Sequence, residues 1–272
     1  MTRNAEPLLP GPSSRRELED LYLRSWPACA ALLQRYPELS NPVLLDVPDG
    51  YPELPLHVLI VGQESGPSRW CPEVDVRRAR SPRAAVVRLM GQYRSFMAGL
   101  DPRVGHFWRF VRRLEAGLGV PGGGALWTNL NKCDLAGRRP RGLEADLARA
   151  LPVLREELRV TRPDVVVFLT GPAYDPLLTE LTGARVEPLP GWRPAAFARV
   201  QGDVLPRASY RIYHPNYLLR FCGSLGERVV RAVVAAARRS VASGSRSPRP
   251  RARPAANPNL RPSSPTRRRC PS

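Results

Sequence analysis

Blocks of apolar and polar residues alternate along the chain in a pattern that predicts strands separated by helices. Four short apolar runs have the length and the β-branched content of buried strands, and DVVVFL at residues 164–169 is the clearest. A run without alternation needs cover on both faces, as a strand of a parallel sheet has. The predicted strands are residues 57–62, 125–129, 164–169 and 210–213.

The segments between these runs show the periodicity of amphipathic helices. In residues 105–119, for example, Phe107, Phe110 and Leu114 fall on one helical face. Strands that alternate with helices are typical of an α/β domain with right-handed crossovers, and residues 185–206, which contain prolines, suit an excursion or a short hairpin. The predicted helices are residues 14–36, 83–99, 105–119, 143–160 and 224–239.

Composition divides the chain into four parts. We expect a flexible N-terminus at 1–14, a helical extension with a proline-rich loop at 15–56, and the α/β domain at 57–239. Residues 240–272 mix arginine, proline and serine with almost nothing to bury, and we expect this tail to be disordered.

The charge balance favours a polyanionic partner. The net charge is +18, and 34 basic against 24 acidic residues remain when the eight arginines after residue 240 are left out. A basic surface attracts phosphates, although 41 of the 42 basic residues are arginine, which a coding bias also explains.

Other bulk features narrow the class of protein. No apolar run is long enough to span a membrane, and the start does not resemble a secretory signal. We therefore expect a cytoplasmic protein that does not bind membranes. The five cysteines are scattered without a C-x-x-C pair, which favours separate thiols over disulfides or a zinc site.

Three short polar stretches follow predicted strands. They are Gly62–Gly66, Thr128–Lys132 and Tyr213–Tyr217. Because the carboxyl ends of parallel strands meet at one edge of a sheet, we expect the three stretches to form a single pocket.

Each stretch brings one chemically useful side chain. The carboxylate of Glu64 can hold and polarise a water, and the amide of Asn129 complements a pyrimidine edge that carries an N–H beside a C=O. A neutral His214 can donate a hydrogen bond to an oxygen on which negative charge develops. Taken singly, each also fits a structural role, and Lys132, the single lysine of the chain, also fits a solvated loop cation.

Together, these stretches resemble the motifs of the uracil-DNA glycosylase superfamily. The first stretch resembles G-Q-D-P-Y in one branch and G-E-A-P-G in another. The stretch from Thr128 to Cys133 is similar to T-N-x-V-K-C of family 4, and residues 213–220 are similar to its Y-H-P-S-x-L-L-R motif. The resemblance covers about residues 57–238.

This resemblance implies a fold and an activity. The fold would be a three-layer α/β/α domain with a central four-stranded parallel sheet. The activity would be hydrolysis of the N-glycosidic bond of uracil, or of a related deaminated base, in DNA during base excision repair. The base must be flipped out of the duplex, because a stacked base cannot be reached. We expect a monomer that needs no metal and no cofactor.

The resemblance also implies roles for individual residues. Glu64 and His214 would be catalytic, Gln63 would line the base pocket through its backbone, and Asn129 and Phe107 would bind the base by hydrogen bonds and stacking. Residues that would contact DNA or face the gap left in the duplex are Lys132, Asn216, Leu218, Leu219 and Arg220.

The chain departs from the family pattern at several positions. Glu64 stands in place of an aspartate and Ser65 in place of a proline. Only Cys133 matches a cysteine of the family 4 iron–sulfur cluster, so we expect no cluster here. Two other functions stay open: a nucleic-acid-binding protein that keeps the glycosylase fold without cutting, and a nucleoside or nucleotide hydrolase.

Overall fold

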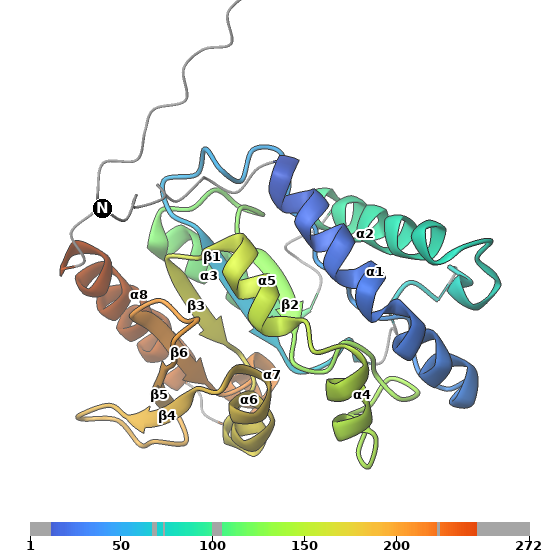
Figure 1. The fold of residues 1–272 in the computed structure, drawn as a ribbon. Helices are drawn as coiled ribbons and strands as arrows, with labels where there is room; N and C mark the ends of the chain where they lie inside the picture. The colour runs from blue at the N-terminus through green and yellow to red at the C-terminus, as the bar shows by residue number, and fades with distance from the viewer. Residues whose placement is uncertain (1–11, 67–69, 73, 100–104, 222–223, 244–272) are drawn as a thin grey trace, which may run out of the picture.

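The computed structural model describes residues 12–66, 70–72, 74–99, 105–221 and 224–243, and a six-stranded sheet lies at its centre (Figure 1). The strand order is β2-β1-β3-β6-β5-β4, in which β2, β1, β3 and β6 are parallel and β5 is antiparallel to both of its neighbours. The strands are β1 (Val58–Gly62), β2 (Leu126–Asn129), β3 (Val165–Phe168), β4 (Arg185–Pro188), β5 (Phe197–Gln201) and β6 (Ala208–Ile212).

The α/β class is confirmed, and the predicted four-stranded parallel sheet is wrong in its extent. The four predicted strands form the parallel part, but β4 and β5 add an antiparallel hairpin at the β6 edge. The hairpin gives a weak sequence signal because its short strands are only partly buried: Phe197 and Val200 lie in the core, whereas Gln201 and Arg185 are exposed.

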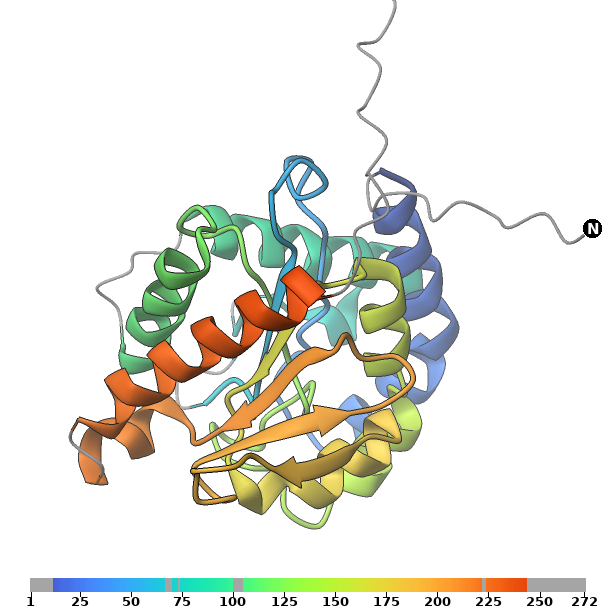
Figure 2. The same cartoon turned by 90° about the vertical axis from the view of Figure 1, so that its left-hand side faces the viewer.

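Helices cover both faces of the sheet. Helices α3 and α8 pack together on one face, and α1 and α5 pack together on the other (Figures 1 and 2). None of the helices in the described ranges is long and apolar enough to cross a membrane. The helices are α1 (Pro12–Arg35), α2 (Pro82–Ala98), α3 (His106–Leu118), α4 (Glu144–Ala150), α5 (Leu154–Thr161), α6 (Asp175–Thr182), α7 (Pro215–Phe221) and α8 (Leu225–Ser243), with short 3₁₀ helices at Val76–Arg78 and Pro172–Tyr174.

The predicted helix at 143–160 is two helices, α4 and α5. Pro152 lies between them, and a proline has no N–H to continue the helical hydrogen bonds. The break turns α5 so that Leu154, Glu157 and Leu158 are buried.

The N-terminal helix shares the core of the α/β domain. Leu18, Tyr22 and Leu33 of α1 are each at most 1% exposed, and α1 packs against α2, α4 and α5. The segment expected as a separate extension at 15–56 is therefore built into the same core. Most of the predicted flexible N-terminus and most of the predicted tail lie outside the described residues, and residues 240–243 belong to α8.

Candidate functional site

The first two polar stretches lie side by side at the carboxyl ends of β1 and β2. Gly62 and Asn129 are register partners in the two strands. Beyond the strands, the backbone N–H of Asn131 donates to the carbonyl of Gln63 at 2.9 Å, and that of Leu130 donates to Gly62 at 3.0 Å. The pairing of the parallel strands therefore continues into the loops and fixes both.

The side-chain amide of Asn129 is buried without a partner. Asn129 is 1% exposed, and neither Oδ1 nor Nδ2 has a hydrogen-bond partner among the described residues. Gly62 leaves the room for this amide, since a Cβ at position 62 would lie 2.3 Å from Asn129 Oδ1. An unsatisfied buried polar group costs about 1–3 kcal/mol, so an amide kept in this state indicates a place for a ligand.

Glu64 is a partly buried carboxylate with a fixed orientation. The hydroxyl of Tyr174 donates to Glu64 Oε2 at 2.7 Å, and Asn131 Nδ2 lies 3.4 Å from the same oxygen. Burial raises the pKa of Glu64, while the hydrogen bonds from Tyr174 and Asn131 act in the opposite direction. A carboxylate held in this way, with its pKa raised, is suited to accept a proton from water.

A second layer of polar residues supports Glu64. Asn131 Nδ2 also lies 3.3 Å from Glu144 Oε1, which accepts a hydrogen bond from Arg139 Nε at 2.7 Å. The guanidinium of Arg139 lies over the ring of Tyr174, 4.0 Å from its centroid. The charge of Arg139 therefore lies beside both Glu144 and the phenol that holds Glu64.

Sequence reasoning missed Tyr174, Arg139 and Glu144. Tyr174 lies just beyond the carboxyl end of β3, where the rule that gave the other site residues also applies. Arg139 and Glu144 carried no signal in the sequence, because a salt bridge and a cation–π contact on the loop after β2 depend on the tertiary fold.

His214 follows β6 and is held in one tautomer. Its Nδ1 accepts a hydrogen bond from the backbone N–H of Asn216 at 3.2 Å, so the proton of the neutral ring is on Nε2. Burial lowers the pKa of His214 to about 4, which keeps the ring neutral at physiological pH. The ring of Phe107 stacks on it, with centroids 5.7 Å apart and planes at 27°.

Hydrogen bonds to backbone carbonyls join the ends of β1, β3 and β6 into one edge. Gln63 Nε2 donates to the backbone carbonyl of Thr170 at 2.7 Å. The backbone N–H of Gly171 donates to the backbone carbonyl of Ile212 at 2.8 Å. Asn129 ends β2 and His214 follows β6, and these are the outer strands of the parallel part. Three strand spacings of about 4.8 Å place their backbones about 14 Å apart.

Helix α7 carries most of the residues predicted to contact DNA. The predicted residues Asn216 and Arg220 are exposed on it. Tyr217, which was not predicted, is 42% exposed beside them. Leu218 is 2% exposed and packs in the core, so its predicted position facing the duplex gap is wrong. Pro215 and Leu218, three residues apart, lie on the same buried face of the helix. The side chain of Leu219, which was also predicted to face the duplex gap, is not among those that the structure describes.

A cleft lies next to α7. Its volume is about 430 Å³, and the guanidinium groups of Arg109 and Arg113 from α3 line it together with Ser224 and Leu218. The exposed face of α7 and this cleft therefore place basic side chains near His214.

Lys132 does not lie on this surface, in contrast to its predicted role in DNA binding. It is 3% exposed, and its Nζ lies 2.6 Å from Glu157 Oε2. Tyr22 donates to the other oxygen of Glu157 at 2.7 Å. Lys132 is therefore buried, and its charge is paired with that of Glu157 of α5 inside the core.

Three of the five cysteines lie in the described part of the chain. Cys29, Cys71 and Cys133 are free thiols, and Cys29 and Cys133 are buried. Among the residues that the structure describes, no group of three or more histidine, cysteine or acidic side chains could hold a metal ion. Burial raises the pKa of the Cys133 thiol well above its ordinary value.

Comparisons with known proteins add no assignment. No protein-family model matches the chain, and a search of curated proteins finds no match.

Proposed function

We propose that this protein is a DNA glycosylase of the uracil-DNA glycosylase type, which removes uracil or a related deaminated base. The unpartnered amide of Asn129 carries the proposal. It offers one donor and one acceptor in a plane, inside the protein and with no described partner. The edge of uracil presents the complementary N–H and C=O, and a flipped base would satisfy both atoms.

The other residues of the edge fit the hydrolysis of an N-glycosidic bond. Glu64 would accept a proton from a water whose oxygen attacks C1′ of the sugar. The bond from C1′ to the base breaks, and its electron pair leaves with the base as an anion. The Nε2–H of His214 would donate to the base oxygen that takes up this charge, and Phe107 would stack beside it.

The dimensions of the edge suit one base. The backbones of Asn129 and His214 are about 14 Å apart by strand spacing. A side chain from each end and one pyrimidine ring between them span that length. Tyr217 and Arg220 on α7, with Arg109 and Arg113 beside them, would meet the DNA around the flipped nucleotide.

The first test measures base release from a labelled oligonucleotide with one uracil, placed opposite G, opposite A or in a single strand. We expect wild type to release uracil and Asn129→Ala to lose about 100-fold in rate, since a site built for hydrogen bonds fails when one partner is removed. Gln34→Ala, an exposed amide on α1, is the matched control and should act like wild type. Equal rates for Asn129→Ala and wild type would contradict the proposed base recognition.

The second test places Glu64→Gln beside wild type in the same assay. Loss of release in the variant supports the role of Glu64 as the water-activating acid, and release by both would remove that role while keeping the enzyme. If wild type binds the oligonucleotide without releasing a base, the chain is a non-cutting binder. Faster hydrolysis of free nucleosides or nucleotides than of DNA would instead indicate the small-molecule hydrolase.

A further inference from the structure

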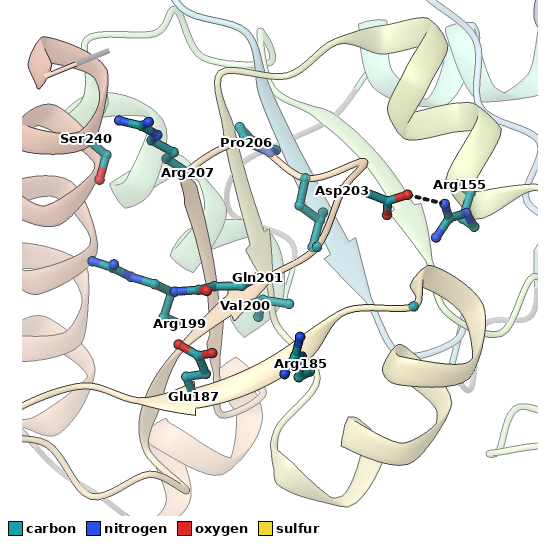
Figure 3. Close-up of a pocket in the computed structure, with 13 residues that line it drawn as sticks. Arg155, Arg185, Glu187, Arg199, Val200, Gln201, Asp203, Pro206, Arg207 and Ser240 are labelled. Carbon is teal, nitrogen blue, oxygen red and sulfur yellow. Dashed lines mark hydrogen bonds and ion pairs between the residues drawn. The ribbon is translucent and has the colours of Figure 1, made fainter.

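A second basic groove lies at the other end of the sheet from the candidate site. Its volume is about 1040 Å³, and it is formed by β4, the end of β5 and the loop that leads into β6 (Figure 3). Arg207 directly precedes β6, whereas His214 follows the same strand. The five residues of β6, at about 3.3 Å each, place the groove about 17 Å along the strand from the candidate site.

The groove carries unneutralised positive charge. Arg155 and Asp203 form an ion pair at 2.8 Å, and hydrogen bonding from Arg155 lowers the pKa of Asp203 (Figure 3). In contrast, the guanidinium groups of Arg185, Arg199 and Arg207 form no ion pair with any described residue. Glu187 is the single remaining acid of the lining, so an excess of positive charge is left for a ligand.

The groove contains one arginine, Arg199, with an unsatisfied hydrogen-bond donor. Its Nε is buried and has no hydrogen-bond partner among the described residues. Arg199 lies opposite Glu187 in the register of β5 and β4, yet the two side chains form no salt bridge. A buried guanidinium N–H without an acceptor indicates a place for an anionic oxygen.

A second cleft continues the groove along α8. Its volume is about 480 Å³, and it shares Arg199 and Ser240 with the first groove. Trp192 lines it and is partly exposed, with the guanidinium of Arg228 5.5 Å above its ring. A base that takes the place of Arg228 on the indole gains stacking and leaves this cation free for a phosphate.

We propose that the two joined clefts form a binding groove for single-stranded nucleic acid, which shares no lining residue with the candidate active site. Phosphates would lie along Arg185, Arg199 and Arg207, and a base would stack on Trp192. Cations that follow a backbone beside an aromatic platform are the pattern of single-strand binding, because stacking needs an unpaired base. An acidic peptide would use the cations but would leave the indole without a planar partner.

The sequence that follows α8 is also basic. Helix α8 ends at Ser243, three residues after Ser240, and residues 244–272 contain eight arginines and no acidic residue. The groove and this segment therefore carry the same sign of charge, and both attract a phosphate backbone.

The test measures binding of the full chain to a fluorescent oligothymidine at several salt concentrations. The variant is Arg185→Ala/Arg199→Ala/Arg207→Ala. The control is Arg16→Ala/Arg24→Ala/Arg88→Ala, which removes the same charge from exposed positions on α1 and α2, two helices that lie away from β4 and β5 in Figure 1. Circular dichroism and thermal unfolding establish that each variant is folded.

We expect the groove variant to lose at least about tenfold in affinity at low salt. We also expect its slope of log K against log salt to fall by about 2, that is about 0.7 for each of three lost phosphate contacts. The control should keep most of the wild-type slope. An equal loss in both variants would show a general charge effect, and an unchanged groove variant would also overturn the proposal.

Trp192→Leu tests the single-strand part of the proposal. It should weaken oligothymidine binding about tenfold and leave binding of an undamaged duplex unchanged. An equal loss on the duplex would overturn the assignment to single strands. Because oligothymidine contains no uracil, these results do not depend on whether the protein excises bases.

Discussion

The amide of Asn129 can occupy its observed position because residue 62 is a glycine, without a Cβ. Gly62 has no positive φ, so its backbone accepts alanine, but the new Cβ would lie 2.3 Å from Asn129 Oδ1. We expect Gly62→Ala to reduce uracil release about 100-fold while circular dichroism shows the fold retained, because overpacking costs about 1–3 kcal/mol. Gly91→Ala on α2, where a Cβ meets only the tip of Arg94, is the matched control. Normal release by Gly62→Ala would contradict the placement of the amide in the site.

The neutral state of His214 gives stability a defined pH dependence. Burial lowers the pKa of His214 from 6.5 to about 4, so between these values the unfolded chain binds the proton and the folded chain does not. The free energy of unfolding should therefore fall as pH drops from 6.5 to 4, by up to about 3 kcal/mol from this group. Measured by urea denaturation across this pH range, the free energy of unfolding of His214→Gln should fall less steeply with decreasing pH than that of wild type. Parallel curves for the two proteins would contradict a buried neutral histidine.

Helix α7 separates an exposed aromatic residue from a buried leucine one position later. Tyr217 is 42% exposed and Leu218 is 2% exposed. We expect Tyr217→Ala to reduce uracil release from duplex DNA, where the gap must be filled, with little effect on single strands or on stability. Leu218→Ala should cost about 2–5 kcal/mol in unfolding free energy and slow release from both substrates. If Leu218→Ala instead kept the wild-type unfolding free energy and slowed uracil release from duplex DNA alone, Leu218 would be the residue that enters the gap.

The strands that the sequence pattern predicted are those in which every residue is buried. Strands β1 and β3 are buried along their whole length, and an unbroken apolar run records this directly. Helix α7 was missed because it has seven residues and begins at a proline, with its first hydrogen bonds accepted by His214. For residues 185–206 the sequence predicts either an excursion or a short hairpin without bounds, because the partial burial of β4 and β5 gives little alternation, and the structure has the hairpin.

The candidate site was predictable to the same degree. The parallel sheet brings Glu64 and Asn129 to one edge, as the positions of the strand ends indicated. The contacts of Tyr174 with Glu64, and of Lys132 with Glu157, needed the packing of distant segments. Local sequence marks where a strand ends, and only the fold decides which side chain there turns inward.

At the scale of the whole molecule, one buried ion pair links the sheet to both helices of one face. Lys132 beyond β2 pairs with Glu157 of α5, which also accepts hydrogen bonds from Tyr22 of α1 and from Thr128. All four side chains are at most 3% exposed. Removing one charge would leave the other buried without its counterion, which is among the larger costs that a substitution can cause.

We therefore expect Lys132→Met to lower the free energy of unfolding by about 3–5 kcal/mol, measured by urea denaturation. The double variant Lys132→Met/Glu157→Leu should recover a large part of this loss, because no unpaired charge remains in the core. A lysine that contacted DNA would behave differently: its loss would leave stability unchanged and would lower the salt dependence of DNA binding by one phosphate contact. A changed salt dependence with unchanged stability would show that Lys132 contacts DNA. A loss of stability that the double variant partly recovers would show that Lys132 holds α1, α5 and the loop of Asn129 together through its ion pair.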